Sequence, residues 1–109
     1  MVTIEEFRQW ALAFPETAEM DHFGMPSFRV KGKIFATYHQ KDNRAMLKLS
    51  LIDQSVYSEM DNKVFYPVPG GWGRKGSTFV ELKNVKKPVF REALKKAWSG
   101  IAPAKIKRD

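Results

Sequence analysis

Hydrophobic positions near the start of the chain recur every three or four residues, which is the spacing of one helix face. These positions are Ile4, Phe7, Trp10 or Ala11, and Phe14. Thr3 stands directly before the segment and Glu6 lies three residues later, which is the pattern of a capping box at a helix start. Pro15 disfavours the helical conformation in the residue before it. We therefore predict a helix over residues 4–13.

A second segment with helical spacing lies near the end of the chain. Its apolar stripe consists of Val89 or Phe90, Ala93 or Leu94, and Ala97 or Trp98. Pro88 stands where the first turn would begin, and a proline is tolerated there because its missing N–H would have no partner. Gly100 is the expected end of this helix. The residues that follow, 102–109, form a basic tail that we expect to be flexible.

Apolar and polar residues alternate between these helices, as they do in half-buried strands. The expected strands cover residues 27–30, 33–39, 45–49, 64–67 and 77–82. Lys31-Gly32 favours a tight hairpin turn because glycine tolerates a positive φ, and Asp42-Asn43 marks a second turn. Glycine and proline make loops of the segments 16–26 and 70–76.

Residues 51–60 interrupt the strands with a helical pattern. Ile52, Val56 and Met60 repeat at i, i+4 and i+8, which predicts a short helix with one apolar face. The element order is then helix, strands with a helical insert, and helix. This order predicts an α+β fold, with two terminal helices packed on one antiparallel sheet of four to six strands. A chain of 109 residues is expected to form a single domain over residues 1–109.

Composition narrows the class of protein. The chain has no cysteine, which excludes disulfides, thiolate metal sites and cysteine nucleophiles. Its two histidines, His22 and His39, do not make a histidine-rich metal site, and we expect neither a metal nor a cofactor. No apolar run approaches the ~18 residues of a membrane span, and the first residues lack the pattern of a signal peptide. We expect a soluble, cytoplasmic protein that does not bind a membrane.

The net charge of +7 is concentrated in the last quarter of the chain. Residues 1–82 hold ten basic and ten acidic side chains, whereas residues 83–109 hold nine basic side chains against Glu92 and Asp109. A one-sided basic stripe is the electrostatic pattern expected for a polyanion partner. Lysines that keep the surface soluble are the alternative explanation.

Three segments together resemble the MmcQ/YjbR-like family of small bacterial proteins. They are G-x-P-x-F-R-V-x-x-K-I-F-A at residues 24–36, Lys48 in its strand, and PGGWGRKGSTFVEL at residues 69–82 followed by A-L-x-x-A-W at residues 93–98. The resemblance implies a CyaY-like (frataxin-like) fold with hairpins likened to a double wing, and it implies DNA binding. Iron binding of the frataxin type uses an acidic ridge, whereas the first helix here offers only Glu5 and Glu6.

We therefore predict a nucleic-acid-binding module of low sequence specificity, with DNA as a possible partner. Basic hairpins and the last helix would contact phosphates, which position a nucleic acid without reading its sequence. A tryptophan in the glycine-rich loop would offer a stacking surface for a base, unless it folds back onto the core. The candidate residues are Arg29, Lys31, Lys33, Lys48, Trp72, Arg74, Lys75, Arg91 and Lys95.

The alternative is a small adaptor that binds a protein or a small anionic ligand in a groove near residues 22–28 and 70–76. Asp21-His22-Phe23 and the turn from Gly24 to Pro26 could line a pocket there. No catalytic residues are identified, because neither histidine has a nucleophile or a carboxylate partner at a recognisable spacing. We expect that the protein is not an enzyme.

Overall fold

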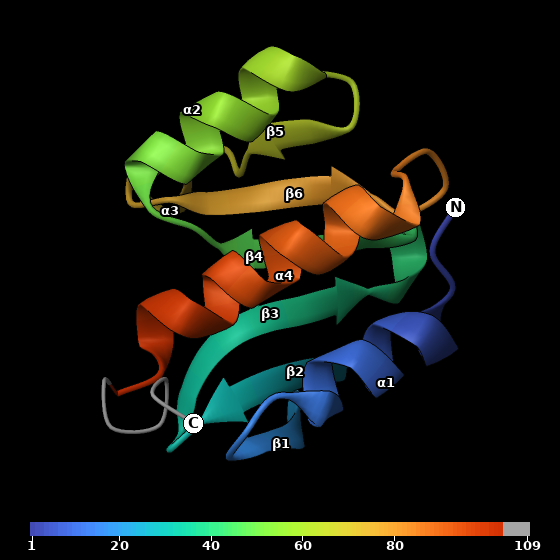
Figure 1. Ribbon diagram of the computed structural model, residues 1–109, viewed down its shortest axis with the longest axis vertical. Coiled ribbons are helices and arrows are strands. Elements are labelled where there is room, and N and C mark those ends of the chain that lie inside the picture. The colour runs from blue at the N-terminus through green and yellow to red at the C-terminus, as the bar shows by residue number, and fades with distance from the viewer. Residues whose placement is uncertain (104–109) are drawn as a thin grey trace.

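Six antiparallel strands form one sheet in the computed structural model of the protein, which describes residues 1–103 (Figure 1). The strands are β1 (Thr17–His22), β2 (Met25–Val30), β3 (Lys33–His39), β4 (Arg44–Lys48), β5 (Phe65–Pro67) and β6 (Ser77–Glu81). Their order across the sheet is β1-β2-β3-β4-β6-β5, and every neighbouring pair is antiparallel. The predicted α+β fold is therefore confirmed.

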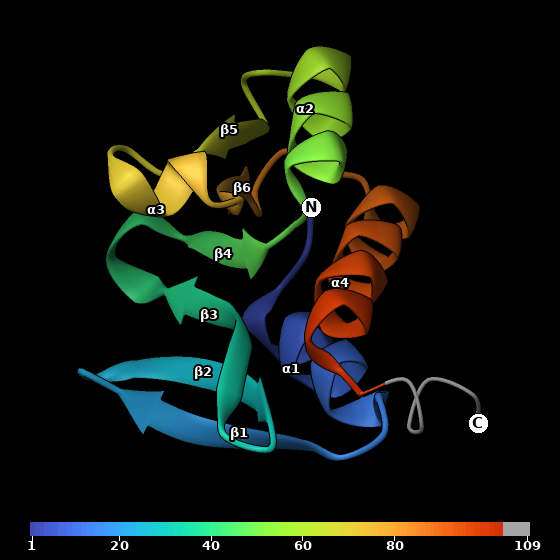
Figure 2. The ribbon, with the colours of Figure 1, turned by 90° about the vertical axis from the view of Figure 1, so that its left-hand side faces the viewer.

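Two terminal helices, α1 (Ile4–Ala13) and α4 (Lys87–Ile101), lie on the same face of the sheet, as Figure 2 shows from the side. The core fills the space between these helices and the strands. The Phe7 ring of α1 is central to it, at 5.0 Å from the ring of Phe28 in β2 and 5.2 Å from the ring of Phe90 in α4. The opposite face of β1–β4 carries no helix (Figure 2). We call it the helix-free face.

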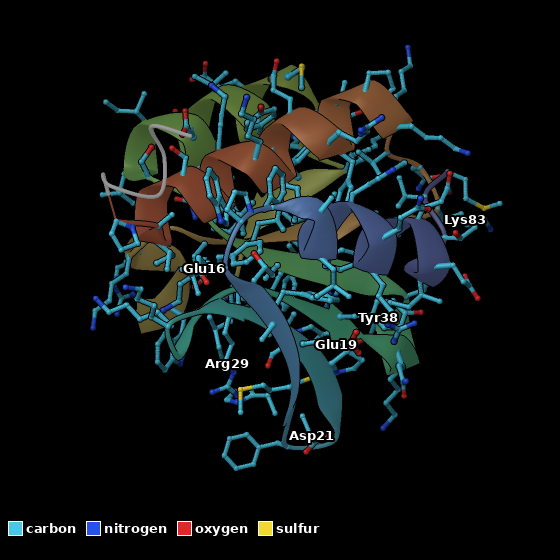
Figure 3. All side chains as sticks on the ribbon, turned by 60° about the horizontal axis from the view of Figure 1, so that its bottom comes forward. Glu16, Glu19, Asp21, Arg29, Tyr38 and Lys83 are labelled. Carbon is cyan, nitrogen blue, oxygen red and sulfur yellow. The ribbon has the colours of Figure 1, made fainter. Side chains whose placement is uncertain are left out.

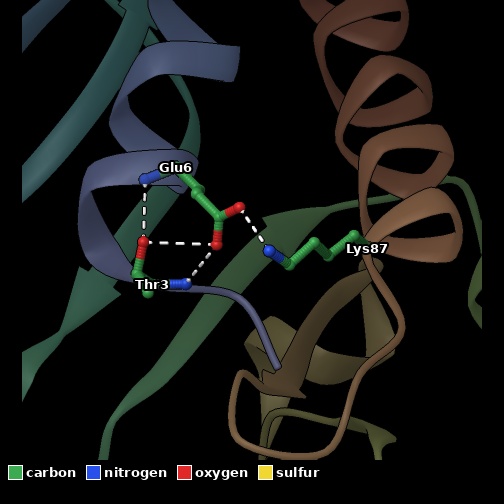
Figure 4. Close-up of polar contacts among 3 residues, drawn as sticks. All are labelled: Thr3, Glu6 and Lys87. Carbon is green, nitrogen blue, oxygen red and sulfur yellow. Dashed lines mark hydrogen bonds and ion pairs between the residues drawn. The ribbon is translucent and has the colours of Figure 1, made fainter.

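The predicted capping box starts α1 (Figure 4). The Thr3 hydroxyl accepts a hydrogen bond from the Glu6 backbone N–H at 3.1 Å, and the Glu6 carboxylate accepts one from the Thr3 N–H at 3.1 Å. The Lys87 ammonium donates to the other Glu6 oxygen at 2.7 Å. This lysine contact, followed by the Thr3 backbone bond, holds the pKa of Glu6 below its usual value. The capping box thus also links the starts of α1 and α4.

Residues 16–26 are not a loop, so that prediction is wrong. They contain β1 and the start of β2, joined by a turn in which Phe23 and Gly24 have φ values of 52° and 84°. An edge strand such as β1 pairs with one neighbouring strand only, and its four middle residues are exposed. No apolar alternation marks such a strand in the sequence.

Helix α2 (Leu51–Met60) forms where predicted, but its apolar stripe faces outward. Ile52 is 77% exposed, and Val56 and Met60 are each 56% exposed. The buried side chains are Gln54 and Tyr57. The Tyr57 ring stacks on Phe65 at 4.9 Å, and its hydroxyl donates to Glu92 of α4. The contacts of these two buried side chains therefore fix the orientation of this helix.

The last helix continues one residue beyond its predicted end, because Gly100 lies inside α4. Its predicted core side chains Phe90, Leu94 and Trp98 are buried. Ala102, the first residue of the predicted flexible tail, is also buried, and residues 104–109 of that tail lie outside the described residues. No helix within residues 1–103 is both long enough and apolar enough to cross a membrane.

Candidate functional site

The helix-free face contains a hollow of about 250 Å³. We call it the sheet hollow. Its apolar lining residues are Met25, Ile34, Met46, Val68, Trp72 and Phe79, and its polar lining residues are His22, Thr37, His39, Lys48 and Ser77. These residues come from β1, β2, β3, β4, β6, α3 and, for Val68, the loop after β5, so the strand order brings distant parts of the sequence together.

Trp72 and Lys48 meet at this hollow. Lys48 ends β4, and its ammonium lies 5.9 Å from the centre of the Trp72 ring. Trp72 is 65% exposed and does not fold back onto the core. The segment that carries it is not a plain loop, since Gly71–Arg74 form the short helix α3. A cation thus lies over the face of an exposed aromatic ring, and both side chains line the hollow.

The close fit of α3 against its neighbours explains why a glycine stands at position 73. A Cβ atom on Gly73 would lie 1.8 Å from the carbonyl oxygen of Val68, so no other residue fits here without a backbone shift. The buried amide of Gln54 donates to the carbonyl of Gly73 at 2.9 Å and to the carbonyl of Ser77 at 3.1 Å. Sequence reasoning missed Gln54, because periodicity shows only apolar positions.

The hairpin of β1 and β2 forms the opposite rim of the sheet hollow. Arg29 projects on the side away from α1 and α4, and Asp21 lies near the hairpin tip (Figure 3). The Arg29 guanidinium donates to the Ser27 hydroxyl at 3.0 Å and lies 3.5 Å from the His22 ring nitrogen Nδ1. Phe23 at the tip is 91% exposed. The groove segments 22–28 and 70–76 therefore do border one hollow, through His22, Met25 and Trp72.

The floor of the hollow is a set of paired side chains. His39 Nε2 lies 3.0 Å from the Thr37 hydroxyl oxygen, and the His39 ring meets Phe79 edge-on at 5.3 Å. Burial lowers the pKa of His39, and the positive charge of Arg44 lowers it further. Arg44 itself covers the Phe79 ring at 3.7 Å and donates to the Tyr66 hydroxyl at 3.0 Å. Phe79 and Tyr66 therefore fix the Arg44 side chain in place.

The predicted cations fall into two groups. Lys31 and Lys33 flank the β2–β3 turn, and Arg74 and Lys75 end α3; all four are exposed. The turn and α3 lie on the same side of the molecule, at the left of Figure 1. Arg29, Lys48 and Trp72 lie at the helix-free face. Lys33 instead shares a strand face with the buried Phe35, so its side chain starts on the helix-covered side of the sheet.

Arg91 and Lys95 form the second group, because α4 lies in the helix layer on the other face of the sheet. The Arg91 guanidinium lies 5.0 Å from the centre of the Trp10 ring, and with Lys95 it borders a separate hollow between α1 and α4. The structure does not bring them to the sheet hollow.

Metal ligands do not gather in the part of the chain that the structure describes. Among residues 1–103, no three histidine, aspartate or glutamate side chains lie close enough together to hold a metal ion. The arrangement on the helix-free face instead offers an apolar hollow, an exposed aromatic ring and surrounding cations. A flat aromatic ring with an attached anionic group would complement these side chains.

Comparisons with known proteins agree with this fold. The sequence model of the family described as YjbR matches residues 12–99. A crystal structure of protein DR2400 from Deinococcus radiodurans, a DUF419 domain, is similar with a TM-score of 0.81 at 20% sequence identity. The similarity covers 99% of this chain and 88% of that one. No curated protein matches.

Proposed function

The chain belongs to the YjbR family, and from this premise and the geometry of the helix-free face we propose that it binds nucleic acid with low sequence specificity. The observation that carries the proposal is the pairing of Lys48 with the exposed Trp72 ring at 5.9 Å, beside an apolar hollow. A cation next to a stacking surface is the combination that a nucleotide requires, since phosphate and base are adjacent in it.

Phosphate contacts would come from the cations around the helix-free face. Lys48 lines the hollow, Arg29 lies beside the lining residue His22, and Arg74 and Lys75 follow Trp72 in the chain. Lys31 and Lys33 would add positive charge at the β2–β3 turn. Such contacts neutralise the backbone and position it, but carry no sequence information. The last helix is not a recognition helix, because its residues Phe90, Leu94 and Trp98 are buried in the core.

In this proposal, nucleic acid binds the helix-free face and not the helix layer. A matched pair of variants tests this location. Arg74→Glu/Lys75→Glu and Arg91→Glu/Lys95→Glu each reverse one arginine and one lysine, and all four side chains are exposed. The first pair ends α3 beside the hollow and the second lies in the helix layer. Both variants change the net charge equally, so a difference between them reports location rather than total charge.

Fluorescence anisotropy of labelled DNA and RNA, titrated at several salt concentrations, measures the outcome. We expect micromolar binding by the native protein and a steep salt dependence, with a log–log slope of about −0.9 for each duplex phosphate neutralised. Arg74→Glu/Lys75→Glu should weaken binding and flatten the slope more than Arg91→Glu/Lys95→Glu. Equal effects would move the interface away from the helix-free face, and no binding at low salt would refute the proposal.

A small anionic ligand is the second candidate, favoured by one observation. The sheet hollow is lined mainly by apolar side chains and joins residues 22–28 to residues 70–76. Burial of an apolar ring gives affinity that salt does not screen. Binding that survives high salt and is lost in Trp72→Ala, but not in Arg74→Glu/Lys75→Glu, would favour this candidate over nucleic acid.

A further inference from the structure

The size of the sheet hollow limits what it can hold. Its volume of about 250 Å³ is smaller than the ~300–1,000 Å³ typical of pockets for drug-sized molecules. One aromatic ring system fits this space, whereas a stacked base pair does not. An occupant would contact the Trp72 ring at the rim and the apolar side chains of Met46 and Phe79 in the floor.

The charge around the hollow selects among flat ring systems. Within residues 1–103, no aspartate or glutamate lines it, and Lys48 is the one lysine or arginine that does. Because the Lys48 ammonium lies 5.9 Å from the Trp72 ring centre, an anionic group joined to a ring stacked there would be within its reach. The hollow therefore fits a ring with an attached phosphate better than an uncharged ring or a cation.

Polar groups in the floor can meet the edge of a heterocycle. The Thr37 hydroxyl and the His39 ring are 3.0 Å apart and line the hollow, and Ser77 adds a third polar side chain. Each of these groups can donate or accept a hydrogen bond. Such a mixed set tolerates different bases, which agrees with low sequence specificity.

We infer that the sheet hollow receives one unpaired nucleobase, stacked on Trp72 with its phosphate at Lys48, so that the protein prefers single-stranded to duplex nucleic acid. This inference rests on the proposed nucleic-acid binding and adds the strand form and the base contact. A paired base reaches such a hollow only after it leaves its stack, and that step costs free energy. A single strand presents its bases without this cost.

The experiment compares three labelled oligonucleotides with the same number of phosphates per strand. One is single-stranded oligothymidylate, the second carries abasic sites along its central part, and the third is a blunt duplex of two complementary strands. Loss of stacking on one aromatic ring weakens binding by roughly tenfold or more. We therefore expect the native protein to bind the first oligonucleotide at least ~10-fold more tightly than the abasic one, and more tightly than the duplex.

Two substitutions of Trp72 test whether the preference for intact over abasic strands arises at the hollow. Trp72→Ala should bind the intact and abasic strands with equal affinity, whereas Trp72→Phe should retain part of the preference. Trp72 is 65% exposed, so neither change opens a cavity in the core, and thermal melting confirms that each variant is folded. Arg91→Glu/Lys95→Glu is the control that should keep the full preference for intact bases.

The outcomes separate this inference from the proposed function. Equal binding of intact, abasic and duplex oligonucleotides, with a steep salt dependence, would overturn the base contact and leave nucleic-acid binding standing. The same holds if a preference for intact bases persists in Trp72→Ala, because the base would then be bound elsewhere. No binding of any oligonucleotide at low salt would overturn the proposed function and this inference with it.

Discussion

The side-chain amide of Gln54 donates a hydrogen bond to the carbonyl of Gly73 at 2.9 Å, and this bond joins α2 to the short helix that carries Trp72. The same nitrogen is 3.1 Å from the carbonyl of Ser77 and 3.2 Å from the hydroxyl of Thr78. One buried amide thus connects α2, α3 and β6. The position of Trp72 at the sheet hollow depends on a residue that does not line the hollow itself.

Replacement of Gln54 by leucine should loosen α3 and destabilise the fold. Leucine fills a similar volume with an apolar side chain but removes the donor from two buried carbonyls. A buried polar group without its partner costs about 1–3 kcal/mol, so we expect the free energy of unfolding to fall by about 2 kcal/mol. Urea denaturation measures the change. Gln9→Leu, on the exposed side of α1, is the control and should change stability by less than about 0.5 kcal/mol.

A pair of glycine variants tests the close approach of α3 to its neighbouring loop. Gly73→Ala places a Cβ atom 1.8 Å from the Val68 carbonyl oxygen, and a backbone atom cannot rotate away as a side chain can. We expect a loss of about 3 kcal/mol or more. Gly100→Ala meets nothing within 4 Å and lies in α4, so it should add up to about 1 kcal/mol. Similar melting temperatures for the two variants would contradict this packing.

The outward stripe of α2 gives a third prediction. Ile52→Gln and Val56→Gln should each change the free energy of unfolding by less than about 0.5 kcal/mol, because both side chains are more than half exposed. Leu94→Ala, in the buried stripe of α4, should cost about 2–5 kcal/mol. Denaturation curves of the three variants measure these changes in the free energy of unfolding. A large loss in Ile52→Gln would mean that this side chain packs inside the protein.

Local chemistry made much of the fold predictable. Thr3 and Glu6 form the capping box that their spacing indicates, and the turn at Lys31 and Gly32 has the positive φ values, 51° and 83°, that a tight hairpin requires. The apolar stripe of α4 is likewise buried as its spacing predicts. In these cases, the residues that determine an element are neighbours in sequence, so one sequence suffices.

Features that depend on distant residues were not predictable in the same way. The edge strand β1 is defined by its pairing with β2, and the orientation of α2 by the partners of Gln54 and Tyr57. The sheet hollow exists because β4 lies between β3 and β6, which places Met46 and Trp72 beside Met25. The predicted groove segments, 22–28 and 70–76, supply the two rims of this hollow. Its floor of Thr37, His39 and Phe79 follows from the strand order, which sequence patterns do not show.

The lowered pKa of His39 predicts how stability varies with pH. Burial and the nearby Arg44 charge disfavour the protonated ring in the folded protein, and the weaker attraction of Asp42 does not reverse this. In the unfolded chain the ring titrates near its ordinary pKa of about 6.5. Below that pH the unfolded state binds more protons than the folded state, so stability rises with pH in this range.

We therefore expect the His39 contribution to be complete above about pH 6.5 and to decline as the pH falls toward the lowered pKa of the folded state. His39→Gln keeps a neutral polar side chain near Thr37 and should flatten this part of the profile. Urea denaturation in steps from about pH 8 to about pH 5 measures the difference in unfolding free energy between the two proteins. His22→Gln retains His39 and should keep most of the native slope, because the His22 charge is the smallest of the causes that lower the pKa of His39. If native protein and His39→Gln lose stability in parallel, the His39 ring is not the group responsible.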